Sequence, residues 1–123
     1  MTYNMETDKF KTIQVYLSGK VTGLSHNEAR DSFMCASYAA YKCFADEEFK
    51  GNMIRIVNPL SIPGEMKSWA DYMLRDLMIL KECDYIVMIP GWKDSLGATI
   101  ERLFAQACGI EVRYLGVDYN KDI

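Results

Sequence analysis

Residues 84–117 read DYIVMIPGWKDSLGATIERLFAQACGIEVRYLGV, and this stretch decides the fold class. The apolar run 84–90 predicts a strand, and the loop 91–97 then opens a helix that runs to about Cys108. Gly109 ends this helix, and residues 111–117 predict another strand. A strand, a helix and a second strand in this order are typical of a right-handed crossover between parallel strands.

The upstream part of the chain repeats this alternation. The predicted elements are a strand at 12–18, a helix from about Ser25 to Phe49 closed by Gly51, a strand at 53–59 and a helix from about 68 to Cys83. Both helices begin with a capping box, Ser25-x-x-Glu28 and Ser68-x-x-Asp71. Four strands alternating with three helices predict a small open parallel α/β sheet with helices on both faces, flavodoxin-like or Rossmann-like. We expect a flexible segment at 1–11 and a single domain at 12–123.

Composition and charge narrow the classes of partner. The chain has 123 residues, of which 50% are hydrophobic and 25% charged, and its formal net charge is −3. A negative net charge disfavours a nucleic-acid polymer as partner, whereas a local group of amides with one lysine can still bind a small anion. The apolar runs are too short to cross a membrane, and no secretory signal pattern opens the chain. We therefore expect a cytoplasmic protein without membrane contact.

The cysteines and the histidine give little support to a metal site. Four cysteines occur without a C-x-x-C pair, and the chain has one histidine. We expect reduced cysteines buried in the core, no metal and no cofactor. His26 is expected to be a solvated residue of the first helical turn rather than a catalytic base.

Ligands of open α/β sheets bind beyond the carboxyl ends of the strands, which here are followed by segments 18–25, 58–68 and 90–101. The first contains S-G-K-V-T-G, in which Gly19 and Gly23 flank Lys20. Glycines allow backbone amides to approach an anion, and Lys20 is a possible charge partner. A plain strand-to-helix turn explains the same residues equally well.

Asp76 breaks the pattern of the second helix. The apolar face of this helix is formed by Trp69, Met73, Leu77 and Leu80, and Asp76 falls within it, whereas Arg75 projects to the opposite side. An unpaired carboxylate in an apolar face is costly. Two explanations are open at this point: Asp76 accepts backbone N–H bonds from a neighbouring loop, or it faces a ligand cavity.

Glu101 falls in the first or second turn of the third helix, at the border of its apolar face. A glutamate near a helix N-terminus is commonly only a favourable partner of the helix dipole. The functional alternative is a carboxylate at the ligand-binding edge of the sheet, where it can attack an anomeric carbon.

Three segments carry a resemblance to a known family. The segments are YLSGKVTG (16–23), WADYMLRDLMILKECDYIVMIPGW (69–92) and DSLGATIERLFAQACG (94–109). They resemble the nucleoside 2-deoxyribosyltransferase-like superfamily, above all a small bacterial and phage branch with a V-N-P loop and a P-G-W-x-x-S-x-G-A-x-x-E signature. The resemblance implies that Glu101 is the nucleophile at the sugar C1′, that Asp76 lies close to the base and that Tyr16 supports the nucleophile.

The same resemblance assigns the substrate-binding residues. The stretch 95–101 has the serine-to-glutamate spacing of deoxynucleoside 5′-monophosphate N-glycosidases, which implies that Ser95 contacts a 5′-phosphate. Asp94 is the candidate for a second acid of this loop, and Trp92 either stacks on the base or packs over the sheet edge. The substrate-binding set implied by the motifs and loops is Ser18, Gly19, Lys20, Gly23, Trp92, Asp94, Ser95 and Gly97.

The function expected from these observations is an N-glycosidase or deoxyribosyltransferase acting on a nucleoside or its 5′-monophosphate. Glu101 would form a glycosyl ester, and Asp76 or Asp94 would protonate the departing base. Related enzymes complete their pockets from a neighbouring subunit, and the chain is rich in Tyr and Met, so we expect a homo-oligomer. The alternatives are a non-catalytic module that binds a nucleotide or an ADP-ribose-like ligand, and a structural accessory protein of a phage or plasmid.

Overall fold

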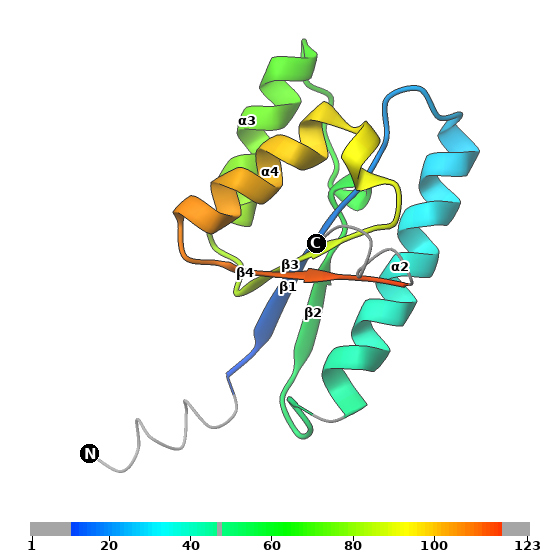
Figure 1. Cartoon of the computed structure of the whole chain (residues 1–123). Helices are drawn as coiled ribbons and strands as arrows, with labels where there is room; N and C mark the ends of the chain where they lie inside the picture. The colour runs from blue at the N-terminus through cyan, green and yellow to red at the C-terminus, as the bar shows by residue number, and fades with distance from the viewer. Residues whose placement is uncertain (1–10, 47, 117–123) are drawn as a thin grey trace.

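A computed structural model of the chain describes residues 11–46 and 48–116 (Figure 1). Within this part, four strands alternate with three α-helices and two short 3-10 helices. Their bounds are β1 (Ile13–Ser18), α2 (His26–Asp46), β2 (Ile54–Val57), η1 (Pro59–Ser61), α3 (Trp69–Leu80), β3 (Tyr85–Met88), η2 (Trp92–Asp94), α4 (Leu96–Ala107) and β4 (Glu111–Tyr114). All strand pairs are parallel and the order is β2-β1-β3-β4, which confirms the predicted open α/β sheet.

The helices cover both faces of the sheet. In Figure 1, α2 lies on one side of the strands, and α3 and α4 lie together on the other. Each face has its own apolar cluster: Phe33 and Phe44 of α2 pack on Val15 and Leu17 of β1, whereas Leu80 of α3 belongs to the cluster on the opposite face. These three layers are the expected solution for a sheet whose strands are apolar on both faces.

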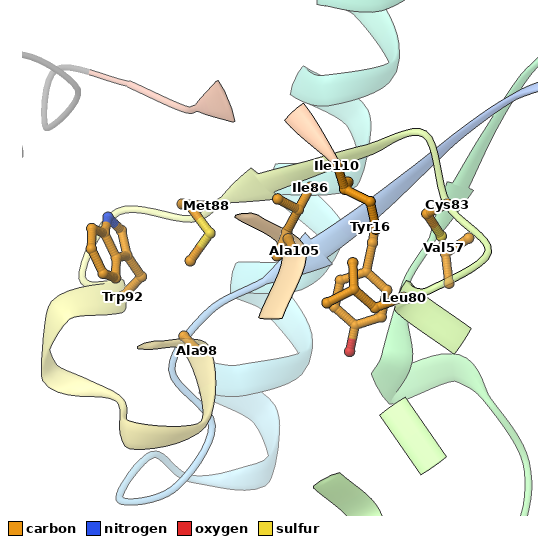
Figure 2. Close-up of a cluster of buried hydrophobic side chains, with 10 residues drawn as sticks. All are labelled: Tyr16, Val57, Leu80, Cys83, Ile86, Met88, Trp92, Ala98, Ala105 and Ile110. Atoms are coloured by element: carbon orange, nitrogen blue, oxygen red, sulfur yellow. The ribbon is translucent and has the colours of Figure 1, made fainter. Parts of the chain in front are cut away.

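The central strand β1 supplies side chains to both faces. Val15 and Leu17 lie in the cluster beneath α2, and Tyr16 lies in the cluster beneath α3 and α4. Figure 2 shows Tyr16 among the buried side chains of that second cluster. Because side chains alternate along a strand, Ser18 points to the same face as Tyr16.

The predicted helix starts are confirmed by hydrogen bonds. The Ser25 hydroxyl accepts the backbone N–H of Glu28 at 3.1 Å, and the Glu28 carboxylate accepts the backbone N–H of Ser25 at 2.8 Å. The Ser68 hydroxyl accepts the N–H of Asp71 at 3.1 Å. His26 is exposed in the first turn of α2, as predicted.

Several elements end earlier than predicted. The N–H of Phe49 bonds to the carbonyl of Phe44 at 3.2 Å, so the chain has already left the α-helical pattern of α2, which ends at Asp46. β2 ends at Val57, because the Asn58 side chain caps η1. The predicted strand end at Val117 lies outside the described residues.

The prediction of four buried cysteines is wrong. All four cysteines are free, but only Cys83 is buried, whereas Cys35, Cys43 and Cys108 are exposed. A helix lying on a sheet is covered along one stripe only, and the thiols of Cys35 and Cys43 lie off the buried stripe of α2. Cys108 follows the last residue of α4. In the described part of the chain, no helix is long and apolar enough to cross a membrane.

Candidate active site

A buried carboxylate lies at the carboxyl end of the central strand. Glu101 is 6% exposed, and both of its oxygens accept a short hydrogen bond. The Tyr16 hydroxyl donates to Oε2 at 2.6 Å, and the Ser18 hydroxyl donates to Oε1 at 2.6 Å. The two donors are themselves fully buried, so this group of three side chains is shielded from water.

Two periodicities bring these side chains together. Tyr16 and Ser18 are two residues apart on β1 and therefore share a face of the sheet. Glu101 lies in the second turn of α4, on the buried stripe that also contains Ala98 and Ala105. The small alanine side chains let α4 lie close to the sheet, and the glutamate can then reach the strand.

Burial dominates the electrostatics of Glu101. Desolvation raises the pKa of Glu101 from its ordinary value of 4.5 to about 7, against the two hydroxyl donors, which lower it. The negative charge of Asp76 adds to the increase in the pKa of Glu101. Burial and the neighbouring carboxylates raise the pKa of Tyr16 far above its usual range, so Tyr16 is a hydrogen-bond donor and not a base.

Asp76 is paired with the preceding arginine. Arg75 Nε and Nη2 donate to Asp76 Oδ1 at 3.1 and 2.9 Å, and the same Nη2 donates to the Pro59 carbonyl at 3.4 Å. Burial raises the pKa of Asp76, while Arg75 opposes this increase. The charge of Asp76 raises the pKa of both Tyr16 and Glu101, so these three side chains are electrostatically coupled.

The open question about Asp76 is answered in part by this pair. Within the described residues its carboxylate accepts from a guanidinium rather than from backbone N–H groups. The explanation that Asp76 accepts backbone N–H bonds from a neighbouring loop is therefore wrong about the donor. The contact with the loop is made by Arg75 instead. The prediction that Arg75 points away from the apolar face is also wrong, since its side chain folds back and is only 18% exposed.

The predicted site residues of the loop before α4, Trp92, Asp94 and Ser95, differ in their surroundings. Ser95 is the N-cap of α4, where its hydroxyl accepts the Ala98 N–H at 3.1 Å. Trp92 is buried, with the Arg102 guanidinium 5.0 Å from its ring centroid, and its burial favours packing over base stacking. Asp94 is exposed in η2, and the carboxylate whose charge acts on Glu101 is Asp76.

Two of the predicted glycines have packing reasons for lacking a side chain. A Cβ at Gly19 would lie 2.9 Å from the Ile89 Cβ, and a Cβ at Gly97 would lie 3.3 Å from the Met73 sulfur. Gly19 is therefore needed where β1 passes β3, and Gly97 where α4 passes α3. Gly23 is exposed, and Lys20 is partly exposed in the same loop.

The structure adds a contact for one predicted site residue and a further residue beside Asp76. The sequence analysis groups Ser18 with the substrate loop, and the structure shows its hydroxyl bonded to Glu101. The position of Ser18 two residues after Tyr16 is the signal for this contact. The sequence analysis assigns Arg75 no role in the site, because a helical position indicates only the direction of Cβ.

The fold and the site define a small α/β protein with a buried acidic centre at the carboxyl end of its central strand. The chain belongs to the family described as "Domain of unknown function (DUF4406)", whose profile matches residues 13–114. Searches of curated proteins and of solved structures found no match.

A wide groove of about 1160 Å³ lies apart from this centre. It runs along the outer edge of β2, between α2 and α3, and none of the acidic-centre residues lines it. Four large apolar side chains border it and are at least half exposed, namely Met34, Tyr38, Tyr41 and Met78. Such an exposed apolar patch is typical of an interaction surface.

The raised pKa of Glu101 makes stability depend on pH. The folded state keeps the proton of Glu101 up to about pH 7, whereas the unfolded chain releases it near 4.5. Stability from this group is therefore complete below pH 4.5 and decreases as pH rises through 7, by about 3 kcal/mol at most. We expect Glu101→Gln, which cannot ionise, to gain stability relative to the wild type by up to that amount between pH 4.5 and pH 8.

Urea unfolding of both proteins at the two pH values measures this difference. Glu65→Gln is the matched control, because Glu65 is exposed in the loop before α3. An equal difference between the Glu101→Gln variant and the wild type at both pH values would show that Glu101 is not the buried titrating group.

Proposed function

We propose that this chain cleaves the N-glycosidic bond of a (deoxy)nucleoside or its 5′-monophosphate through a covalent glycosyl-glutamate intermediate. The observation that supports this most is the Glu101 carboxylate, held on both oxygens by Tyr16 and Ser18 and close to the charge of Asp76. Nucleophilic displacement at an anomeric carbon requires one positioned carboxylate and one proton donor.

In the first step, an oxygen of ionised Glu101 forms a bond to C1′ while the bond from C1′ to the base nitrogen breaks. The electron pair of that bond goes to the nitrogen, which takes a proton from the carboxylic acid of Asp76. The hydroxyls of Tyr16 and Ser18 fix the carboxylate so that little reorganisation is needed during attack. The transition state resembles an oxocarbenium ion.

In the second step, water attacks C1′ and releases the Glu101 carboxylate. The proton of that water goes to the Asp76 carboxylate, which returns the site to its starting state. A second base in place of water would give a transferase. Asp94 is the alternative acid, but its exposed position in η2 favours Asp76 for this role.

Loss of Glu101 should abolish base release. Glu101→Gln and Glu101→Ala each remove the nucleophile, and we expect a decrease in kcat on the order of 10³-fold or more. The assay is incubation with a panel of nucleosides and 5′-monophosphates, with free base separated by chromatography.

Glu65→Gln is expected to keep wild-type turnover in this assay. A folded Glu101→Gln variant with wild-type turnover would exclude Glu101 as nucleophile. If the wild type binds nucleotides by calorimetry but releases no base from any of them, the chain is instead the binding module.

We further propose that the 5′-monophosphate is preferred over the nucleoside. Ser95 caps α4, a helix of 12 residues, so a phosphate there would meet a hydroxyl, first-turn amides and the positive end of the helix dipole. Lys20, in the loop after β1, supplies a cation near the same end of the sheet.

Changes at Ser95 should therefore act on the monophosphate selectively. Ser95→Asp keeps an oxygen that can cap α4 but repels a phosphate, so we expect kcat/KM to decrease about tenfold or more on the monophosphate only. Ser95→Ala loses both the cap and the contact, and Ser68→Ala at the start of α3 is the matched cap control. A better rate of the wild type on the nucleoside, or equal losses on both substrates, would contradict the phosphate site.

We also propose that the protein works as a homo-oligomer in the cytoplasm. Four free cysteines suit a reducing compartment, and the groove along β2 is a candidate contact surface. We expect light scattering at micromolar concentration to give at least a dimer. Tyr38→Lys with Met78→Lys should shift the protein toward monomer, whereas Leu103→Lys on the exposed side of α4 should not. A monomeric wild type would contradict this proposal.

A further inference from the structure

The side chain of Arg75 is more restrained than a surface ion pair requires. Its guanidinium bonds to Asp76 through two nitrogens, to the Pro59 carbonyl through one of them, and lies 5.2 Å from the centroid of the Tyr72 ring. The side chains of Arg75 and Asp76 are only 18% and 15% exposed. Each of these contacts restricts a different motion of the guanidinium plane.

The third nitrogen of Arg75 shows that this placement has a cost. Nη1 is buried and has no hydrogen-bond partner within residues 11–46 and 48–116. An arginine whose only role is to neutralise a nearby charge can turn its spare nitrogen toward water. A buried donor without a partner therefore needs an explanation other than stability.

The two bonds to Asp76 are both made to one oxygen. Nε and Nη2 donate to Oδ1, and no hydrogen bond from the described residues reaches Oδ2. Two donors on Oδ1 fix the plane of the carboxyl group, so the direction of Oδ2 is fixed as well. Oδ1 is occupied, and Oδ2 is the oxygen left to carry a proton.

We propose that Arg75 is a positioning residue that fixes the orientation of Asp76, so that Oδ2 is presented to the departing base. This inference rests on the proposed function, in which Asp76 is the proton donor. The bond from Arg75 to the Pro59 carbonyl adds a second anchor for the guanidinium that holds Asp76.

Arg75 also affects the pKa values of the two carboxyl groups, those of Asp76 and Glu101. Its positive charge favours ionised Asp76, and ionised Asp76 raises the pKa of Glu101. The other groups facing this pair are the hydroxyls of Tyr16 and Ser18, which are donors in the folded state. Removing the charge of Arg75 should raise the pKa of Asp76 and lower that of Glu101.

The test compares Arg75→Met and Arg75→Lys with the wild type. Arg75→Met removes charge and geometry, whereas Arg75→Lys keeps the charge and loses the two donors on one oxygen. We expect both to lower kcat about tenfold or more with KM changed less than about threefold. In Arg75→Met the ascending limb of the pH–rate profile should also move to lower pH, and in Arg75→Lys it should stay close to that of the wild type.

Asn58→Ala is the matched control for the loop. It removes the side-chain cap of η1 without touching Asp76, and it should keep kcat within about twofold. Wild-type kcat in Arg75→Met, full rescue by lysine, or an equal loss in Asn58→Ala would each overturn the proposal.

Carbon NMR titration of the Asp76 and Glu101 carboxyl groups separates this inference from the proposed function. A wild type that releases no base contradicts the proposed function. In that case an unchanged pKa of Asp76 in Arg75→Met would also overturn the inference that Arg75 fixes Asp76. A raised pKa of Asp76 in that variant would support the inference.

Discussion

The carboxylate of Glu101 is enclosed by the fold, and the remainder of the site is arranged around that burial. Removing an ionised carboxylate from water is costly unless hydrogen-bond donors take the place of water. β1 supplies two such donors, because strand alternation points Tyr16 and Ser18 to one face. The order β2-β1-β3-β4 makes β1 an inner strand, so both hydroxyls are shielded from solvent. The order of the strands and the position of α4 on the sheet thus together enclose the side chain of Glu101.

A network serving stability alone would favour a neutral residue at this position. Glutamine could accept from one hydroxyl and donate to the other without any cost of ionisation. The chain instead has a glutamate there and adds Asp76, whose charge raises the pKa of Glu101. Two carboxylates that oppose each other's ionisation lower stability, and such pairs are typical of sites that exchange a proton. This balance of costs favours catalysis over binding alone.

The strands, the capping serines and Glu101 could be predicted because each depends on a local pattern, either alternation along a strand or spacing along a helix. The contact of Ser18 could have been predicted in the same way, from its place on the face of β1 that carries Tyr16. The role of Arg75 could not, because a helical wheel gives the direction of Cβ, whereas a long side chain can fold back over its neighbour. The prediction of buried cysteines fails on α2 because hydrophobic character alone does not identify the covered stripe.

The electrostatic coupling of Glu101 and Asp76 connects substrate binding to the proposed chemistry. In the free protein the charge of Arg75 opposes the increase in the pKa of Asp76, whereas burial and the charge of Asp76 raise the pKa of Glu101 to about 7. These effects favour a proton on Glu101. Attack on C1′ requires the reverse distribution, with Glu101 ionised and Asp76 protonated. A base bound against Asp76 excludes water from it and so favours its neutral form. As the proton moves to Asp76, the charge that raised the pKa of Glu101 disappears, and the nucleophile ionises. The substrate would therefore bring the pair into its reactive state by binding.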